Sequence, residues 1–128
     1  MSKENVEIVR TAIEAWGAGD MDSFYASLDP DMIWKPVEAV ASQGHEGLRA
    51  TLARWMDGWD EYEQTAEEFV DMGDRVVATV HFQGRGRGSG IEIDQRFYEV
   101  YTVRDGKVVR MDEYTTRAKA LEAAGLQE

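Results

Sequence analysis

The sequence predicts an α+β domain: a curved antiparallel sheet packed against three N-terminal helices, with a short C-terminal helix. Two changes of pattern carry this prediction. Apolar residues recur at spacings of three and four as far as residue 59, which is typical of helices, and at every second residue from 62 onward, which is typical of strands. No repeat or linker interrupts the 128 residues, so we expect residues 1–128 to form one domain.

Three amphipathic helices are expected in the first half of the chain. The first covers residues 5–17, with an apolar stripe of Val6, Val9, Ile13 and Trp16. The second begins after Asp20, the expected N-cap, and ends at Asp29, because the residue before a proline is pushed out of the helical conformation. A short strand over 31–37 follows. The third helix covers 44–59, with one face formed by Leu48, Leu52, Trp55 and Trp59.

Four strands joined by tight turns are expected in the second half, over residues 63–71, 75–83, 91–103 and 107–116. A last helix, over 117–124, should end at Gly125 in a left-handed conformation. Residues 84–90 alternate Gly with Arg or Ser and fit no phosphate-loop spacing. We expect them to form a hairpin tip with two solvated arginines or, alternatively, a lid over a pocket mouth.

Composition excludes several classes of function. The chain has 14 basic and 25 acidic residues, a net charge of −11, so a nucleic-acid partner is not expected. It has no Cys, and therefore no disulfide, thiolate metal site or Cys nucleophile. The start of the sequence lacks the apolar segment of a signal peptide, and no apolar run is long enough to cross a bilayer. We expect a cytoplasmic protein without a membrane partner.

The strand over 91–103 has two different faces. The inner face is expected to present Ile93, Gln95, Phe97, Glu99, Tyr101 and Val103. Glu99 lies in the middle of this apolar row, where an unpaired carboxylate is expensive and must find a partner or keep its proton. Glu99 is therefore a candidate catalytic acid or base. The alternative is a structural glutamate held by a buried Arg, Tyr or backbone donor.

The turn over 104–106 decides which residue faces Glu99. A two-residue loop would place Asp112 opposite it, whereas a turn with Gly106 in a left-handed bulge places Val109, Met111 and Glu113 on the inner face. Burying Val and Met rather than Arg and Asp favours the bulged turn. Glu113 should then lie diagonal to Glu99, roughly 7 Å away between backbones, and one of the two pKa values should rise. The alternative is a Glu113 that reaches water from the strand end.

Aromatic residues on the inward faces are expected to form a substrate-binding pocket for a small apolar or aromatic molecule, or else a packed core. The candidates are Trp16, Trp34, Trp55, Trp59, Phe97, Tyr101 and Met111. His81 is added because a curved sheet can bring it to the pocket rim or a dimer interface, although it alternates with the apolar face of its strand. Two distant His residues without a His-Glu-x-x-His spacing predict no metal site, and no motif implies a cofactor.

Five segments carry a family resemblance: Trp16-Gly17-Ala18-Gly19-Asp20, Leu28-Asp29-Pro30-Asp31, Gly44-His45-Glu46-Gly47, Tyr101-Thr102-Val103-Arg104-Asp105-Gly106-Lys107-Val108 and Ala120-Leu121-Glu122-Ala123-Ala124-Gly125-Leu126. With the order of the elements, they resemble the SnoaL-like branch of the nuclear transport factor 2-like (NTF2-like) superfamily over nearly the whole chain. The resemblance implies a cone-shaped fold with a pocket between the helices and the concave sheet, often in a homodimer. Because this scaffold supports several chemistries, it implies no single reaction.

Carried over position by position, the resemblance places Glu113 where polyketide cyclases and limonene-type epoxide hydrolases have an essential Asp. Glu99 matches the position of an oxyanion-hole acid in steroid isomerases and of a His in polyketide cyclases. Two positions depart from the family. Lys35, before Pro36, stands where steroid isomerases have their Asp base, and residues 79–81 read Thr-Val-His where the epoxide hydrolases have Arg-x-Asp.

The leading hypothesis is a small-molecule-binding protein with cofactor-free acid/base activity of the isomerase or polyketide-cyclase type, carried by Glu99 and Glu113. One alternative is a non-catalytic ligand-binding or dimeric interaction module. Another alternative is an epoxide-hydrolase-like enzyme. A subunit interaction surface on the outer sheet face, around Arg96, Tyr98, Val100 and Thr102, is compatible with the catalytic and the non-catalytic hypotheses. A homodimer is expected.

Overall fold

The computed structural model describes residues 2–37 and 40–125; Leu126, the last residue of the closing segment above, lies outside these ranges. The elements along the chain are α1 (Ser2–Ala18), α2 (Met21–Ala26), β1 (Leu28–Lys35), β2 (Ser42–Gln43), α3 (Gly44–Asp57), β3 (Trp59–Asp71), β4 (Arg75–Gly86), β5 (Glu92–Arg104), β6 (Lys107–Tyr114) and α4 (Arg117–Ala123). The predicted α+β architecture is confirmed. No helix in the described ranges is both long and apolar enough to cross a membrane.

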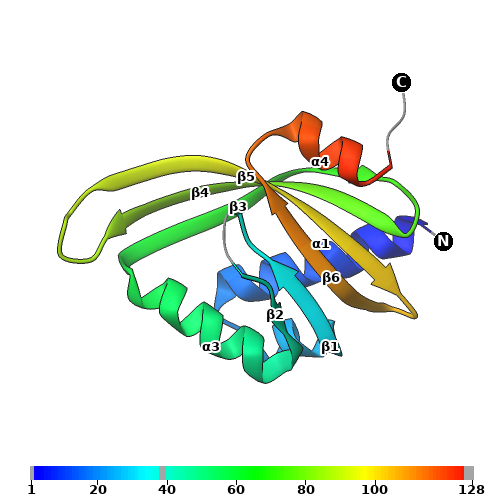
Figure 1. Cartoon of the computed structure of the whole chain (residues 1–128), viewed down its shortest axis with the longest axis horizontal. Coiled ribbons are helices and arrows are strands. Elements are labelled where there is room, and N and C mark those ends of the chain that lie inside the picture. The colour runs from blue at the N-terminus through cyan, green and yellow to red at the C-terminus, as the bar shows by residue number, and fades with distance from the viewer. Residues whose placement is uncertain (1, 38–39, 126–128) are drawn as a thin grey trace.

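The six strands form one curved sheet in the order β2-β1-β6-β5-β4-β3. Figure 1 shows α1, α2 and α3 on one side of this sheet and α4 on the other. Every ladder is antiparallel except β1–β6, which is parallel. The sheet is therefore mixed and not purely antiparallel as expected. The difference arises because β1, which precedes the hairpins in the sequence, pairs with the last strand, β6.

Each face of the sheet buries its own apolar cluster. The inner cluster packs α1 and α3 on the sheet. It includes Val9 of α1, Leu52 of α3 and the strand residues Val76, Val80 and Val108. The outer cluster is smaller and packs α4 on the sheet through Val77, Val100, Ala120, Leu121 and Ala124. Val100 is only 3% exposed, so the proposed outer interaction surface is already partly covered by α4.

The first half of the chain follows the predicted order with shifted boundaries. Asp20 caps α2 as expected, accepting a hydrogen bond from the backbone N–H of Ser23 at 3.2 Å. Strand β1 begins at Leu28, three residues earlier than expected, and includes Pro30. The proline is tolerated because the pairing with β6 shifts between Leu28 and Ile33, so no regular ladder bond is lost at Pro30. The two-residue strand β2 was not predicted.

The β5–β6 turn differs from the predicted one. Asp105 and Gly106 have φ angles of 52° and 79°, so both central residues of a two-residue turn are left-handed. Val103 pairs with Val108 but Thr102 pairs with Arg110, which leaves Val109 as an extra residue in β6. The prediction of a bulge at Gly106 is wrong; the bulge lies three residues later.

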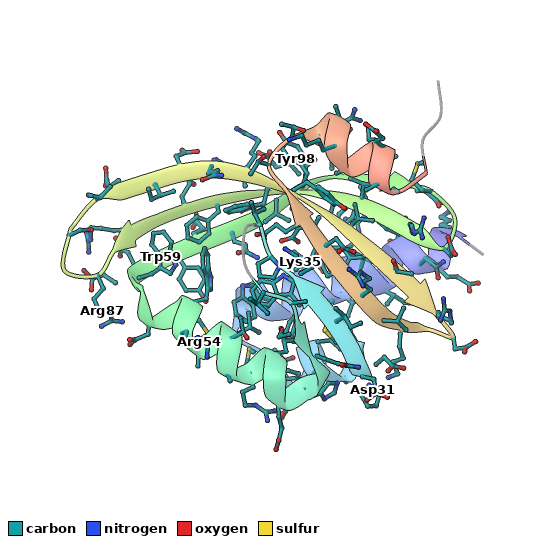
Figure 2. The ribbon with its side chains drawn as sticks, viewed as in Figure 1. Asp31, Lys35, Arg54, Trp59, Arg87 and Tyr98 are labelled. Carbon is teal, nitrogen blue, oxygen red and sulfur yellow. The ribbon has the colours of Figure 1, made fainter. Side chains whose placement is uncertain are left out.

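Arg87 in the predicted hairpin tip is bound to the protein rather than simply solvated. Its guanidinium donates to the carbonyl of Asp57 at 2.7 Å and to that of Trp59 at 3.0 Å. Figure 2 shows it next to the end of α3, whose last carbonyls lack partners within the helix. A cation there also complements the helix dipole. The segment thus ties the β4–β5 hairpin to α3.

Candidate functional site

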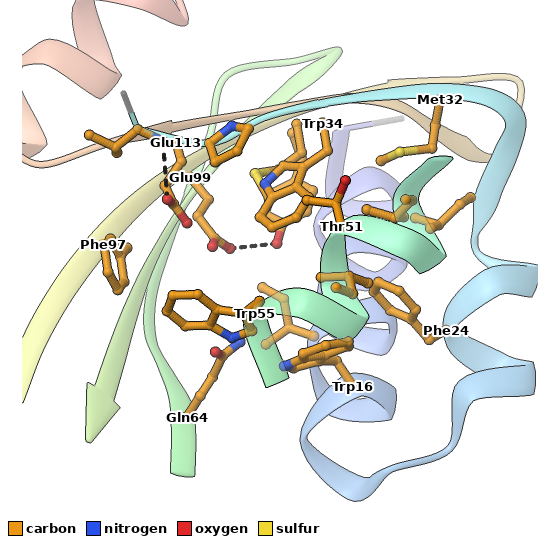
Figure 3. Close-up of a pocket in the computed structure, with 18 residues that line it drawn as sticks. Trp16, Phe24, Met32, Trp34, Thr51, Trp55, Gln64, Phe97, Glu99 and Glu113 are labelled. Atoms are coloured by element: carbon orange, nitrogen blue, oxygen red, sulfur yellow. Dashed lines mark hydrogen bonds between the residues drawn. The ribbon is translucent and has the colours of Figure 1, made fainter. Parts of the chain in front are cut away.

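A cavity of about 360 Å³ lies between the inner face of the sheet and helices α1 and α3. Figure 3 shows the side chains that project into it. Eight of the site residues predicted from the sequence line this cavity: Trp16, Trp34, Trp55, Phe97, Glu99, Tyr101, Met111 and Glu113. Alternation along β5 and β6 directs the last five inward, as the sequence pattern indicated. Their catalytic and binding roles stay predictions.

Trp59 and His81 are not brought into this cavity. Trp59 begins β3 and packs its ring 4.8 Å from Phe82 and 5.3 Å from Trp55, in an aromatic cluster beside the pocket. His81 lies on the outer face, as its alternation with Val80 implied. Its Nε2 is 2.6 Å from an Asp94 carboxylate oxygen, so a substrate-binding role in this pocket is not supported.

The two glutamates face each other directly. Glu99 pairs with Glu113 in the β5–β6 ladder, rather than lying diagonal to it, because the two-residue turn and the extra residue Val109 each advance β6 by one position. Glu99 is 6% exposed and accepts a 2.5 Å hydrogen bond from the Tyr101 hydroxyl. Glu113 accepts a 3.3 Å hydrogen bond from the backbone N–H of Val37. Figure 3 shows both bonds at one wall of the cavity.

Burial and mutual repulsion set the protonation of this pair. Burial and the neighbouring Glu113 charge raise the pKa of Glu99 to about 8, although the Tyr101 hydrogen bond opposes them. Burial also raises the pKa of Glu113, against hydrogen bonds from Val37 and from Glu99. Two buried carboxyls that face each other repel when both are ionised, so near neutral pH Glu99 keeps its proton.

Tyr101 completes a chain of hydrogen bonds from donor to acceptor. Burial and the adjacent carboxyls raise the pKa of Tyr101 well above its ordinary value, so the phenol keeps its proton and remains a donor. The order is Tyr101 hydroxyl, Glu99, Glu113, with Val37 as the second donor to Glu113. No Lys, Arg or His side chain is among the lining residues of the described structure. No cation lining the cavity in the described structure would therefore stabilise both carboxyls in their charged form.

The Val37 N–H and Gln64 are polar groups of the site that were not predicted from the sequence. The expected strand over 31–37 includes Val37, but β1 ends at Lys35 because Pro36 has no N–H for the ladder, which frees the Val37 N–H for Glu113. The Lys35-Pro36 pair was the available signal. Gln64 also lines the cavity, and its position in the alternating segment that starts at residue 62 was the signal for an inward side chain.

Trp34 contributes a buried donor with no acceptor. Its indole N–H has no hydrogen-bond partner within the described ranges, and in Figure 3 the ring lies beside the carboxyl pair. An unpaired buried N–H is unfavourable. Within the same ranges no group of His, Asp or Glu side chains is arranged to hold a metal ion. The cavity thus combines largely apolar walls with one acid pair and a few polar groups.

Comparisons with known proteins agree with this architecture. A structure described as a SnoaL-like polyketide cyclase from Jannaschia sp. CCS1 is 26% identical, with a TM-score of 0.79 over 98% of this chain and 94% of that one. TerC co-crystallised with polyporic acid is 22% identical, with a TM-score of 0.80 over 96% and 99%. A protein with a ketosteroid isomerase-like fold from Catenulispora acidiphila DSM 44928, in complex with trimethylamine, is 17% identical, with a TM-score of 0.75 over 94% of each chain.

No curated protein matches the sequence. The predicted homodimer and the predicted cytoplasmic location stay predictions. A model of the SnoaL-like domain matches residues 9–111, which is most of the chain and includes every lining residue of the cavity except Glu113. The chain therefore belongs to the SnoaL-like family of NTF2-like proteins.

Proposed function

We propose that this protein is a cofactor-free acid/base enzyme that removes a proton from the carbon next to a carbonyl group of an apolar or aromatic molecule, as in isomerisation or aldol cyclisation. One observation carries the proposal: two buried carboxyls, both with raised pKa values, face each other in a largely apolar cavity. Such a pair offers a base and an acid at the same place.

The proposed step uses both glutamates. The ionised Glu113 takes the proton from the carbon, and the electron pair of the broken C–H bond forms a carbon–carbon double bond. The carbonyl oxygen takes the proton of Glu99, so the product is a neutral enol, with Glu113 protonated and Glu99 ionised. In an isomerisation, Glu113 gives its proton to another carbon of a conjugated enol, and the enol hydroxyl returns its proton to Glu99 as the carbonyl re-forms. In a cyclisation, the enol carbon attacks a second carbonyl within the molecule, the new alkoxide takes the proton of Glu113, and the enol hydroxyl again returns its proton to Glu99.

The contacts of Glu99 support this proposal over a purely structural pocket. The Tyr101 hydroxyl holds Glu99 as a structural role would require, but Glu99 also faces a second carboxyl, Glu113, and open volume remains beside the pair. An epoxide-hydrolase mechanism is not favoured, because no Arg or Asp side chain lines the cavity in the described structure. The polyporic acid of TerC and the cyclase description of the Jannaschia protein are in keeping with a small-molecule substrate.

The test is hydrogen–deuterium exchange in a simple ketone. 4-Phenylcyclohexanone is apolar and carries exchangeable hydrogens on both carbons beside its carbonyl. In buffered D₂O, we expect the protein to accelerate their loss, followed by proton NMR. The rate should fall above about pH 8, where Glu99 loses its proton. Glu113→Gln and Glu99→Gln should each lower the catalysed rate by roughly 100-fold or more.

The matched control is Glu92→Gln, since Glu92 is an exposed residue of the same strand as Glu99 and should leave the rate unchanged. Circular dichroism and the binding of the ketone establish that each variant is folded. Unchanged exchange in both Glu99→Gln and Glu113→Gln would refute the proposal, as would the absence of any acceleration by the wild-type protein.

A further inference from the structure

A second group of polar atoms lines the cavity away from the carboxyl pair. It consists of the Gln64 amide on β3 and the indole N–H groups of Trp16 on α1 and Trp55 on α3. None of the three makes a side-chain hydrogen bond with another described residue. In Figure 3 the Gln64 amide points toward the ring of Trp55, with Trp16 nearby.

The packing around Gln64 supports this placement. Gln64 lies opposite Phe82 in the β3–β4 ladder, and the ring of Phe82 is 5.3 Å from that of Trp55. On the other side, a Cβ added at Gly17, the residue after Trp16, would lie 3.7 Å from the Gln64 backbone oxygen. The ends of α1 and α3 therefore both approach β3 at Gln64.

Strand pairing places this group far from the glutamates. Gln64 pairs with Phe82, and Phe82 pairs with Gln95, four residues before Glu99 on β5. Four residues of strand correspond to roughly 13 Å, and two strand spacings to roughly 10 Å, before sheet curvature and side-chain length shorten the gap. A molecule that reaches both groups must be extended, with apolar rings between its two ends.

We propose that Gln64, with Trp16 and Trp55, forms a subsite that binds a second oxygen of the ligand. The group offers the two N–H bonds of the amide and two indole N–H bonds, against one amide oxygen as acceptor. This surplus of donors selects an oxygen that accepts, such as a phenol or carbonyl oxygen, over a hydrocarbon end. The inference rests on the proposed function for the other end of the substrate, a carbonyl beside Glu99 and Glu113. The substrate class is then an extended aromatic ketone oxygenated at its far end.

The experiment compares two ketones that differ in one oxygen: 4-phenylcyclohexanone and 4-(4-hydroxyphenyl)cyclohexanone. Their dissociation constants are measured by isothermal titration calorimetry. The wild-type protein should bind the hydroxylated ketone about tenfold more tightly, since each hydrogen bond formed is worth roughly 2- to 12-fold. Gln64→Met keeps the length of the side chain without its amide. It should reduce the preference to less than about twofold and change the affinity for the plain ketone by less than about threefold.

Gln83→Met is the matched control, because Gln83 is an exposed glutamine on the outer face, bonded to Asp94, and should keep the preference. Equal wild-type affinity for the two ketones, failure to bind either, or a full preference in Gln64→Met would overturn the subsite. The wild-type comparison requires no variant, so it holds even if one folds poorly.

Exchange measured on the same samples separates the two proposals. Glu113→Gln should lose exchange and keep the hydroxyl preference. If the wild-type protein catalyses no exchange while the preference depends on Gln64, the proton-transfer mechanism fails and the subsite stands. If exchange depends on Glu113 while the preference is absent, the subsite fails and the mechanism stands.

Discussion

The two faces of the sheet carry the same kind of side chain in opposite electrostatic states. On the inner face, burial raises the pKa of Glu99 and of Glu113, and no Lys, Arg or His among the described residues lines the cavity beside them. On the outer face, Glu67 receives bonds of 2.6 and 3.1 Å from Arg96, and Glu68 receives bonds of 2.9 and 3.2 Å from Arg117. These arginine contacts lower the pKa of both outer glutamates.

Solvent and partner, rather than residue type, produce this difference. A carboxylate in water with a guanidinium beside it is stable in its charged form. A buried carboxyl with another carboxyl opposite it keeps a proton instead. Strand alternation decides which environment each residue meets, so one position along a strand separates a solvated ion pair from a candidate acid.

The largest effect should appear in the dependence of stability on pH. The pKa of Glu99 is about 8 when folded and 4.5 ordinarily, so between these values the folded chain holds a proton that the unfolded chain has lost. Stability should therefore fall as pH rises from about 4.5 to 8 and then level off. The fall should reach a few kcal/mol, because a tenfold change in proton affinity is worth about 1.4 kcal/mol. Urea unfolding at each pH measures it.

Variants on the two faces should separate the contributions to this profile. Glu99→Gln should remove most of the fall, because an amide has no proton to lose. The outer glutamates have lowered pKa values, so they lose their stabilising effect only as pH drops below about 4.5. Glu68→Gln should accordingly leave the fall between pH 4.5 and 8 intact. Equal slopes in the wild-type protein and Glu99→Gln would contradict this account.

A smaller effect is expected from added volume on the inner face. A Cβ at Gly84 would lie 2.8 Å from the Phe82 ring and 3.0 Å from Trp59, so Gly84→Ala should destabilise the protein by about 1–3 kcal/mol. Gly47 in α3 is the control, because its added Cβ meets only Ser42 at 3.9 Å. Gly47→Ala should stabilise the protein by about 0.5–1 kcal/mol through helix propensity. Urea midpoints that rank the two the other way would disprove the packing argument.

The smallest effect should come from the outer ion pairs. Arg96→Met removes the guanidinium from Glu67, but both side chains are open to solvent and salt, so the urea midpoint should hardly change. Ketone exchange should also be unaffected, because Arg96 lies outside the cavity. A midpoint shift as large as that of Gly84→Ala would show that the outer face contributes more to stability than its exposure suggests.

The strongest sequence predictions came from alternation. In β5 it gave the correct inner face, including Glu99, Tyr101 and Phe97. Helical spacing likewise placed Trp16 and Trp55 on the cavity wall. These patterns succeed because a buried face tolerates few polar residues, so a single Glu within an apolar row is conspicuous.

The failures concern features that local pattern does not encode. The parallel pairing of β1 with β6 is a long-range contact, and the pattern within a strand does not identify its neighbour. Val108 and Val109 are alike in sequence, so nothing local showed which is the extra residue. Sheet curvature does not bring His81 to the pocket rim, and its ring lies beside the carboxylates of Glu67 and Asp94 on the outer face.

Because Val109 is an extra residue in β6, the number of residues between the turn and the cavity decides which carboxyl faces Glu99. Without that insertion, the ladder that begins with Val103 opposite Val108 would continue to Asp112 opposite Glu99, and Glu113 would project outward. An alignment of relatives that places its gap elsewhere in β6 would compare Asp with Glu at non-equivalent positions. In a redesign, a one-residue deletion there would exchange a longer base for a shorter one without changing any other amino acid.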